Sequence, residues 1–64
     1  MIKLLCKKDS YGYNEKYGMM DIEYTKGKIY SAEGSLDNRI YMTNNFGTVD
    51  YFNSVEGNEF FELK

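Results

Sequence analysis

The carboxylates of Asp21 and Glu23 have the spacing in this chain that comes closest to a chemical site. The two residues lie two positions apart in an extended segment, so their side chains would project from one face of a strand. A carboxylate pair can raise the pKa of one member or hold a hard cation. Two solvated acids on an outward face have the same spacing, and we favour that simpler interpretation.

The residue types that most enzymes need are missing. The chain has no histidine, which removes the commonest general base and the usual partner of a nucleophilic serine or cysteine. Its one cysteine, Cys6, cannot form a Cys/His zinc site and is expected to be a small buried apolar residue. The six glycines are spread singly, without a phosphate-binding pattern. We therefore predict no enzymatic activity, no metal site and no cofactor.

Aromatic side chains are the stronger functional candidates. Tyr11, Tyr13 and Tyr17 lie within one segment rich in turn-forming residues, and tyrosine is enriched at protein interfaces. The alternative for these tyrosines is packing over an edge of the core. Phe46 is expected at the tip of a hairpin, where it either folds back onto the protein or anchors a partner. We predict that these four residues form a partner-binding surface.

Length and composition indicate the size and class of the domain that carries these rings. A chain of 64 residues forms one small domain, over residues 1–64, and 42% hydrophobic residues is typical of a folded protein. The sequence shows no signal peptide and no apolar run long enough to span a bilayer. We therefore expect a cytoplasmic protein without a membrane partner. The net charge of −2 disfavours a nucleic-acid partner.

Charge is unevenly placed along the chain. Lysines concentrate near the start, whereas acids dominate the last fifteen residues, and the groups concerned are Lys3, Lys7, Lys8, Asp50, Glu56, Glu59 and Glu62. If the first and last strands lie side by side, these opposite charges partly neutralise one another. An acidic docking face is the less favoured alternative.

The clearest element is a β-hairpin over residues 39–52. Two runs rich in β-branched and aromatic residues flank Asn44-Asn45-Phe46-Gly47, and asparagine and glycine tolerate the positive φ of a tight reversal. Other strands are expected at 1–8, 19–24, 28–33 and 59–63, with a long structured loop over 9–18 and room for one short helical turn within 53–58. The predicted fold class is all-β, a closed or nearly closed small barrel of about five strands.

The order of these parts resembles an SH3-like barrel with a long first loop. The segment Thr25-Lys26-Gly27-Lys28-Ile29-Tyr30 is similar to the T-x-G-K-x-Y strand entry of very small phage and prophage proteins of this class. The N-x-G turn at 45–47 and the aromatic pairs at 51–52 and 60–61 extend the resemblance over roughly residues 20–64. It implies an SH3-like fold and a phage or prophage origin. Since the chain has no tryptophan, the proline-peptide groove of SH3 domains proper is not expected.

Together these features predict a non-catalytic protein-binding module. The resemblance implies a phage or prophage accessory protein in the cytoplasm of a host bacterium, where it inhibits or redirects a host protein such as a defence or nucleic-acid enzyme. Two alternatives stay open. A nucleic-acid-binding barrel would stack bases on the tyrosines beside a groove of lysines. A structural or self-assembling viral component would pair through an exposed edge strand. The oligomeric state is not predicted.

Overall fold

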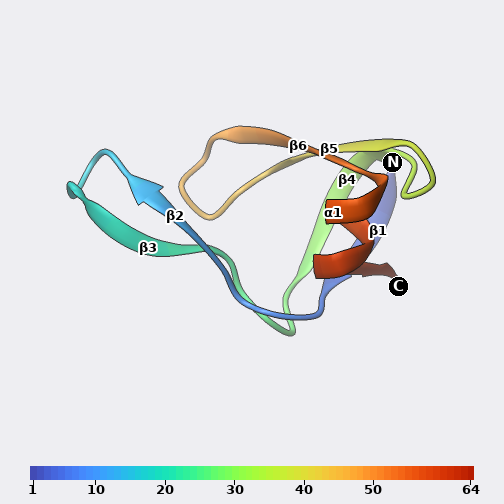
Figure 1. Cartoon of the computed structure of the whole chain (residues 1–64), viewed down its shortest axis with the longest axis horizontal. Coiled ribbons are helices and arrows are strands. Elements are labelled where there is room, and N and C mark those ends of the chain that lie inside the picture. The colour runs from blue at the N-terminus through green and yellow to red at the C-terminus, as the bar shows by residue number, and fades with distance from the viewer.

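Seven strands and one helix make up the fold in the computed structural model, which describes residues 1–64 (Figure 1). In chain order they are β1 (Ile2–Cys6), β2 (Ser10–Asn14), β3 (Met19–Tyr24), β4 (Ile29–Gly34), β5 (Arg39–Thr43), β6 (Val49–Asn53), α1 (Ser54–Phe60) and β7 (Phe61–Leu63). Five strands form an antiparallel sheet in the order β6-β5-β4-β1-β7, whereas β2 and β3 pair only with each other. The all-β prediction is confirmed.

This arrangement is a small barrel-like fold that remains open. The long β2–β3 hairpin is inserted between β1 and β4, and α1 joins β6 to β7. β6 and β7 lie at opposite edges of the sheet and do not pair with each other, so no hydrogen-bonded closure forms. α1 packs against β5, β6 and β7 instead.

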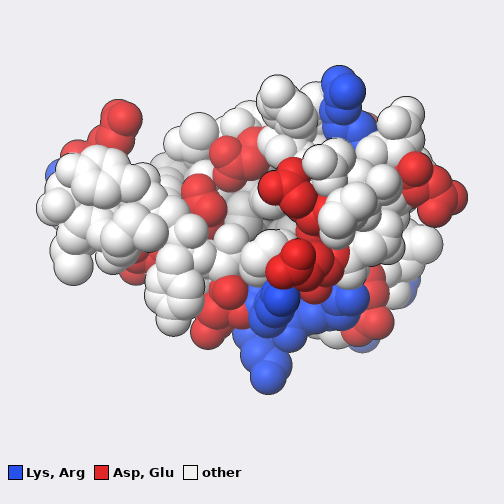
Figure 2. Space-filling model, in the orientation of Figure 1, with Lys and Arg blue, Asp and Glu red and all other residues white.

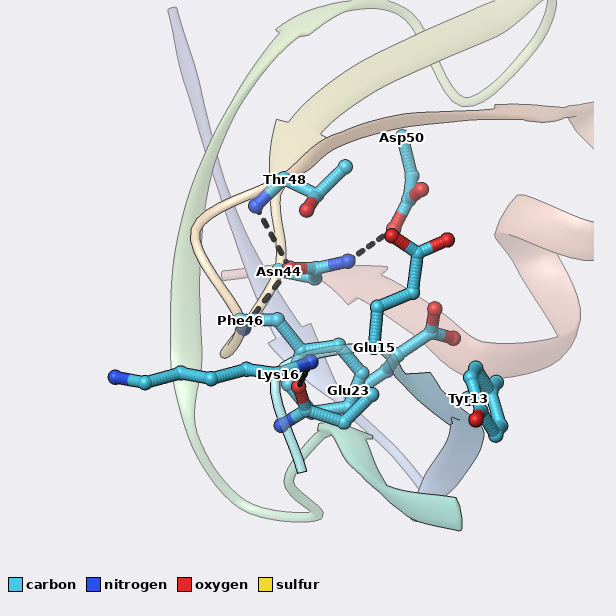
Figure 3. A pocket seen from close by; sticks show the side chains of 9 residues that line it. Tyr13, Glu15, Lys16, Glu23, Asn44, Phe46, Thr48 and Asp50 are labelled. Carbon is cyan, nitrogen blue, oxygen red and sulfur yellow. Dashed lines mark hydrogen bonds between the residues drawn. The ribbon is translucent and has the colours of Figure 1, made fainter. Parts of the chain in front are cut away.

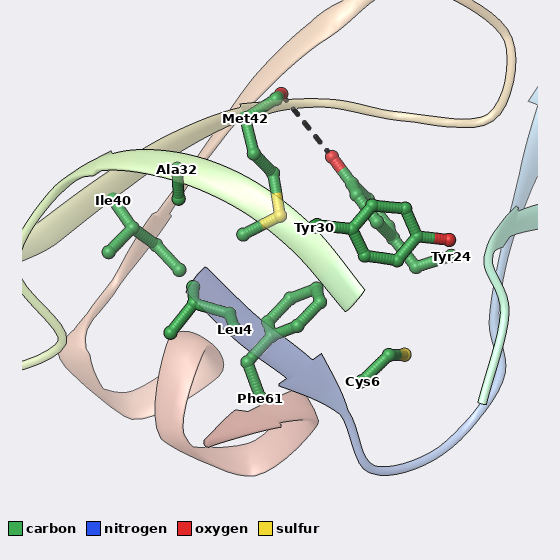
Figure 4. Close-up of a cluster of buried hydrophobic side chains, with 8 residues drawn as sticks. All are labelled: Leu4, Cys6, Tyr24, Tyr30, Ala32, Ile40, Met42 and Phe61. Atoms are coloured by element: carbon green, nitrogen blue, oxygen red, sulfur yellow. Dashed lines mark hydrogen bonds between the residues drawn. The ribbon is translucent and has the colours of Figure 1, made fainter. Parts of the chain in front are cut away.

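The core lies on the inner face of the five-stranded sheet (Figure 4). Alternate residues of β1, β4 and β5 point into it, because successive side chains of a strand face opposite sides. The rings of Tyr24 and Phe61 meet edge to face, with centroids 5.3 Å apart. Cys6 is 1% exposed, which confirms its predicted role as a buried apolar residue. The buried members are Leu4, Cys6, Tyr24, Tyr30, Ala32, Ile40, Met42 and Phe61.

The segment 9–18 is a strand and a turn, and the prediction of a long loop is wrong there. Residues 10–14 pair with β3 over their whole length. The turn-forming residues act at the end of β2, where the backbone oxygen of Asn14 accepts hydrogen bonds from the N–H groups of Tyr17 and Gly18. Pairing with β3 satisfies the backbone of β2, so the intervening glycine and serine do not prevent a strand.

The helix is longer than the single turn expected within 53–58. It begins after Asn53, whose side chain accepts a hydrogen bond from the N–H of Glu56 at 2.9 Å. It continues through Phe60, so the last strand begins at Phe61 and not at residue 59. No helix of the structure has the length and apolar character that crossing a membrane requires.

The first and last strands lie side by side, which is the condition under which their opposite charges can neutralise one another. β1 and β7 pair antiparallel, with Leu5 opposite Glu62. Just beyond these strands, the Nζ of Lys8 lies 2.8 Å from the Oε2 of Glu59. Of the lysines near the start, Lys8 alone forms an ion pair with an acid near the end of the chain.

Candidate functional site

The β2–β3 hairpin, residues 10–24, is called the arm because it extends away from the five-stranded sheet (Figure 1). On the arm, Tyr11, Tyr13 and Tyr17 are 60%, 61% and 63% exposed. Tyr13 pairs with Met20, and Tyr11 pairs with Ile22, so these four side chains share one face of the hairpin. Rings this exposed do not cover the core, and the packing alternative for the tyrosines is wrong.

Two exposed methionines, one on each face of the hairpin, add to the apolar character of the arm, and sequence reasoning missed them. Met19 and Met20 are 58% and 60% exposed. Adjacent residues of a strand point to opposite faces. A hairpin that stands apart from the main sheet cannot bury both methionine side chains. Two adjacent methionines in a predicted strand were therefore the signal in the sequence that one of them would be exposed. The arm therefore carries sulfur-containing side chains as well as rings.

A cleft of about 370 Å³ separates the arm from the turn between β5 and β6 (Figure 3). Tyr13 and Phe46 contribute rings to it, and Glu15, Glu23 and Asp50 contribute carboxylates. The arm supplies the first wall and the β5–β6 hairpin supplies the second. Acidic and aromatic groups from distant parts of the sequence are thus brought together.

The four predicted binding residues are only partly brought together. Phe46 is half-buried and folds back into the cleft beside Tyr13, so it is not a freely projecting anchor. A neighbouring hollow is lined by Phe46 and Tyr17. Tyr11 borders neither hollow and contributes only to the exposed face of the arm.

Asn45 holds the β5–β6 turn against the arm. Its Nδ2 donates to the backbone oxygen of Ile22 at 3.1 Å, and its backbone N–H donates to that of Glu23 at 2.8 Å. Its Oδ1 accepts a hydrogen bond from the hydroxyl of Tyr30 at 2.9 Å. One side chain therefore links the turn to β3 and β4, and these hydrogen bonds fix the position of the turn relative to the arm.

Asn44 shapes the turn itself. Its Oδ1 accepts hydrogen bonds from the N–H groups of Phe46 at 2.9 Å and Thr48 at 3.0 Å, and its Nδ2 donates to Oδ2 of Asp50 at 2.8 Å. Within this turn only Gly47 has a positive φ, of 86°. The hairpin prediction is confirmed, but the asparagines act through side-chain hydrogen bonds and not through the left-handed backbone expected of them.

Glu23 and Asp50 place two carboxylates near each other at the cleft. Loss of solvation and the charge of Asp50 raise the pKa of Glu23 above its ordinary value. The buried hydroxyl of Tyr24 donates to Oδ2 of Asp50 at 3.1 Å. Burial and the charge of Asp50 also raise the pKa of Tyr24, so its hydroxyl stays protonated and remains a donor. Sequence reasoning missed the meeting of Glu23 with Asp50.

The pair expected at Asp21 and Glu23 separates into two environments. Asp21 is exposed, as the solvated interpretation predicts, and accepts a hydrogen bond from the N–H of Ile22 at 2.8 Å. Glu23 is half-buried and lies across Gly12, where an added Cβ would overlap its carboxyl group. No group of three or more His, Cys, Asp or Glu residues is arranged to hold a metal ion.

No basic side chain of the protein forms an ion pair with the cleft acids. The two ion pairs of the structure join the N-terminal amine to Glu33 and Lys8 to Glu59. Lys16 lines the cleft, but its Nζ lies over the ring of Tyr17, 5.5 Å from the centroid. Figure 3 shows the Lys16 side chain extending away from the carboxylates. The acids therefore remain available to an outside cation.

A second pair of exposed rings lies on the outer face of the main sheet. Tyr41 and Tyr51 are paired across β5 and β6, 43% and 67% exposed, with centroids 5.9 Å apart. The guanidinium of Arg39 lies 5.7 Å from the Tyr51 ring centroid. These tyrosine rings contact each other at an interplanar angle of 45° on the five-stranded sheet, whereas Tyr11, Tyr13 and Tyr17 lie on the projecting arm. Tyr41 and Tyr51 provide a matched surface for control substitutions.

Comparisons of the chain with protein-family models, curated proteins and solved structures found no match. A functional assignment therefore depends on the geometry of the arm and the cleft. These combine exposed rings, a preformed hollow and carboxylates without basic partners, which is an arrangement suited to recognition.

Proposed function

We propose that this chain is a non-catalytic protein-binding module that contacts its partner through the arm. The observation that carries the proposal is the exposure of five large side chains on one hairpin, each between 58% and 63%: Tyr11, Tyr13, Tyr17, Met19 and Met20. Apolar groups gathered on a projecting element favour association, because a partner removes their surface from water.

The composition of the arm supports protein recognition. Tyrosine and methionine are enriched in interface cores. A tyrosine ring contributes a large contact area with few rotatable bonds, and methionine adapts to irregular surfaces. The contacts of Asn45 hold the arm near the β5–β6 turn before any partner arrives. Such preorganisation lowers the entropic cost of binding.

The molecule is large enough to provide a standard contact face. Its accessible surface is 4331 Å², and a standard interface buries about 800 Å² on each partner. One interface would therefore cover about a fifth of the surface. The arm together with the cleft beside it is the surface that we assign to this interface.

The partner class that we propose is a host protein, bound by a phage or prophage accessory protein that inhibits or redirects it. The resemblance of residues 20–64 to very small phage barrels supports this setting. The lack of histidine and the burial of Cys6, the one cysteine, support binding in place of catalysis.

The distribution of charge favours a protein partner over a nucleic acid. In Figure 2, lysine and arginine side chains gather along the lower edge of the body, with a further basic group at its upper edge, whereas the arm at the left is mostly uncharged apart from a few acidic groups. Acidic side chains lie between these regions on the same face. A single-strand binder needs cationic groups beside its stacking rings to neutralise phosphates.

Affinity capture with surface variants tests the proposal. The tagged chain is incubated with bacterial lysate, and the captured proteins are compared for the original chain and two double variants. Tyr13→Ala with Tyr17→Ala is expected to lose a stoichiometric partner, because it removes two rings from the arm. Tyr41→Ala with Tyr51→Ala is the matched control and is expected to keep it. Absence of a partner, or equal retention by both variants, contradicts the proposal.

A further inference from the structure

We infer that the cleft between the arm and the β5–β6 turn receives a lysine or arginine side chain of the protein partner, an inference that rests on the function proposed above. Three carboxylates and two rings converge there from different parts of the chain: Glu15, Glu23, Asp50, Tyr13 and Phe46. Figure 3 shows these side chains around a common hollow.

The acids of the cleft lack cationic partners within the molecule. Both ion pairs of the structure lie elsewhere. Lys16, the basic residue of the cleft lining, has its Nζ over the ring of Tyr17 and does not reach the carboxylates. In the folded protein, Glu23 is thus held near Asp50 without a compensating charge, and an incoming cation would supply it.

The aromatic rings of the cleft favour a cation that also has an apolar stem. Tyr13 and Phe46 line the same hollow as the carboxylates. An ammonium or guanidinium group near an aromatic face gains a cation–π contact, and its alkyl stem gains apolar contact with the ring. A volume of about 370 Å³ lies at the small end of ligand pockets. One long basic side chain therefore matches the chemistry of the site.

The arm explains why this cation would belong to a polypeptide. Tyr13 lines the cleft and also carries the exposed face of the arm, where it lies opposite Met20. A partner that covers the arm can therefore place a basic side chain in the cleft within one continuous interface. The apolar contact would provide area, and the charge would determine orientation.

Gly12 provides a way to move a carboxylate without removing its charge. The side chain of Glu23 lies across Gly12, and a Cβ at that position would overlap its flexible end. Gly12→Ala is therefore expected to displace the carboxyl group from its present position. Glu23→Gln removes the charge but keeps the shape. Glu62→Gln removes an exposed charge on β7, away from the cleft, and is the matched control.

The test is an NMR titration of the ¹⁵N-labelled chain with an end-blocked Gly-Arg-Gly peptide and its citrulline analogue. The arginine peptide is expected to shift amide signals of Glu23, Asn44 and Asp50, and the neutral analogue is not. Binding should weaken about fivefold in Glu23→Gln and in Gly12→Ala, and less than about twofold in Glu62→Gln. It should also weaken as salt is raised from about 10 mM to about 150 mM, since salt screens the charges.

The outcomes separate this inference from the proposed function. Equal binding of the two peptides, shifts confined to other surfaces, or full binding by Glu23→Gln would overturn the cleft assignment, even if the arm still captures a protein. Conversely, if arm substitutions leave partner capture unchanged, the proposed function fails even where the arginine peptide occupies the cleft. Thermal unfolding of Glu23→Gln verifies that the variant is folded, so that its loss of binding reports on charge.

Discussion

The hydroxyl of Tyr24 lies inside the core and donates to the carboxylate of Asp50. Tyr24→Phe keeps the ring but removes this donor. Because hydrogen bonds to charged groups are stronger than neutral ones, we expect a loss of about 1.5 kcal/mol in the free energy of unfolding. Urea unfolding followed by circular dichroism measures this loss. The control Tyr51→Phe, on an exposed ring, should change stability by less than about 0.5 kcal/mol. Equal effects would contradict the role of the buried hydroxyl.

Glu23 gives the stability a defined pH dependence. Its pKa is raised in the folded protein, so the folded state binds the proton more tightly than the unfolded state does. The related stabilisation is present below the ordinary value of 4.5 and is lost as pH rises through the folded pKa. Glu23→Gln should therefore be more stable than the original chain at about pH 7, by about 0.5 kcal/mol because solvent screens the charge.

Denaturant unfolding at two pH values tests this sign. At about pH 4 the difference in the free energy of unfolding between Glu23→Gln and the original chain should shrink, because the carboxyl group of Glu23 is then largely protonated. The control Glu62→Gln should lack this pH-dependent advantage. A Glu23→Gln protein that is less stable at neutral pH would show that the carboxylate has a stabilising partner, against the description of the cleft.

At the scale of single residues, the sequence identifies which groups are unusual but not which groups meet. Tyr13 and Phe46 can be selected from the sequence because rings beside turn-forming residues are uncommon. Glu23 and Asp50 cannot be paired in this way. Their proximity depends on Asn45 holding the β5–β6 turn against the arm, and no local pattern encodes that long-range contact.

At the scale of elements, Gly34 controls the connection from β4 to β5. It has a φ of 101°, and an added Cβ would overlap the backbone oxygen of Arg39. Gly34→Ala should therefore destabilise the fold by about 2–4 kcal/mol, as strain adds to a backbone clash. Gly27→Ala is the control, because its φ is 86° but the space around it is open. It should cost about 1–2 kcal/mol. Equal losses in thermal or urea unfolding would contradict this assignment.

The elements differ in how well the sequence predicts them. The hairpin over 39–52 follows from its alternation and its turn residues, since both local signals agree. β2 is not predicted, although its two tyrosines alternate with Ser10, Gly12 and Asn14, because those three residue types favour turns. The sequence predicts a helix shorter than α1 because a seven-residue helix has little intrinsic stability. It depends on the cap at Asn53 and on tertiary packing, which sequence periodicity does not report.

At the scale of the whole molecule, the sequence predicts a small barrel of about five strands, but neither the strand order nor the openness of the barrel could be predicted from it. Closure depends on whether β6 meets β7, and α1 occupies the connection between them. The buried residues that stabilise the fold and the exposed rings proposed for binding lie in two different regions of the chain. The sheet and Tyr24, at the base of the arm, form the core, whereas Tyr11, Tyr13 and Tyr17 farther along the arm remain exposed.

The division between core and arm is tested most directly by site-specific photo-crosslinking to the partner. A benzophenone amino acid replaces Tyr17 on the arm in one protein and Tyr51 on the outer sheet face in another, both of them exposed positions. After irradiation in bacterial lysate, we expect one dominant crosslinked protein from position 17, and none of that protein from position 51. Crosslinks to that protein from position 51 alone, or equally from both positions, would contradict the assignment of the arm as the contact surface.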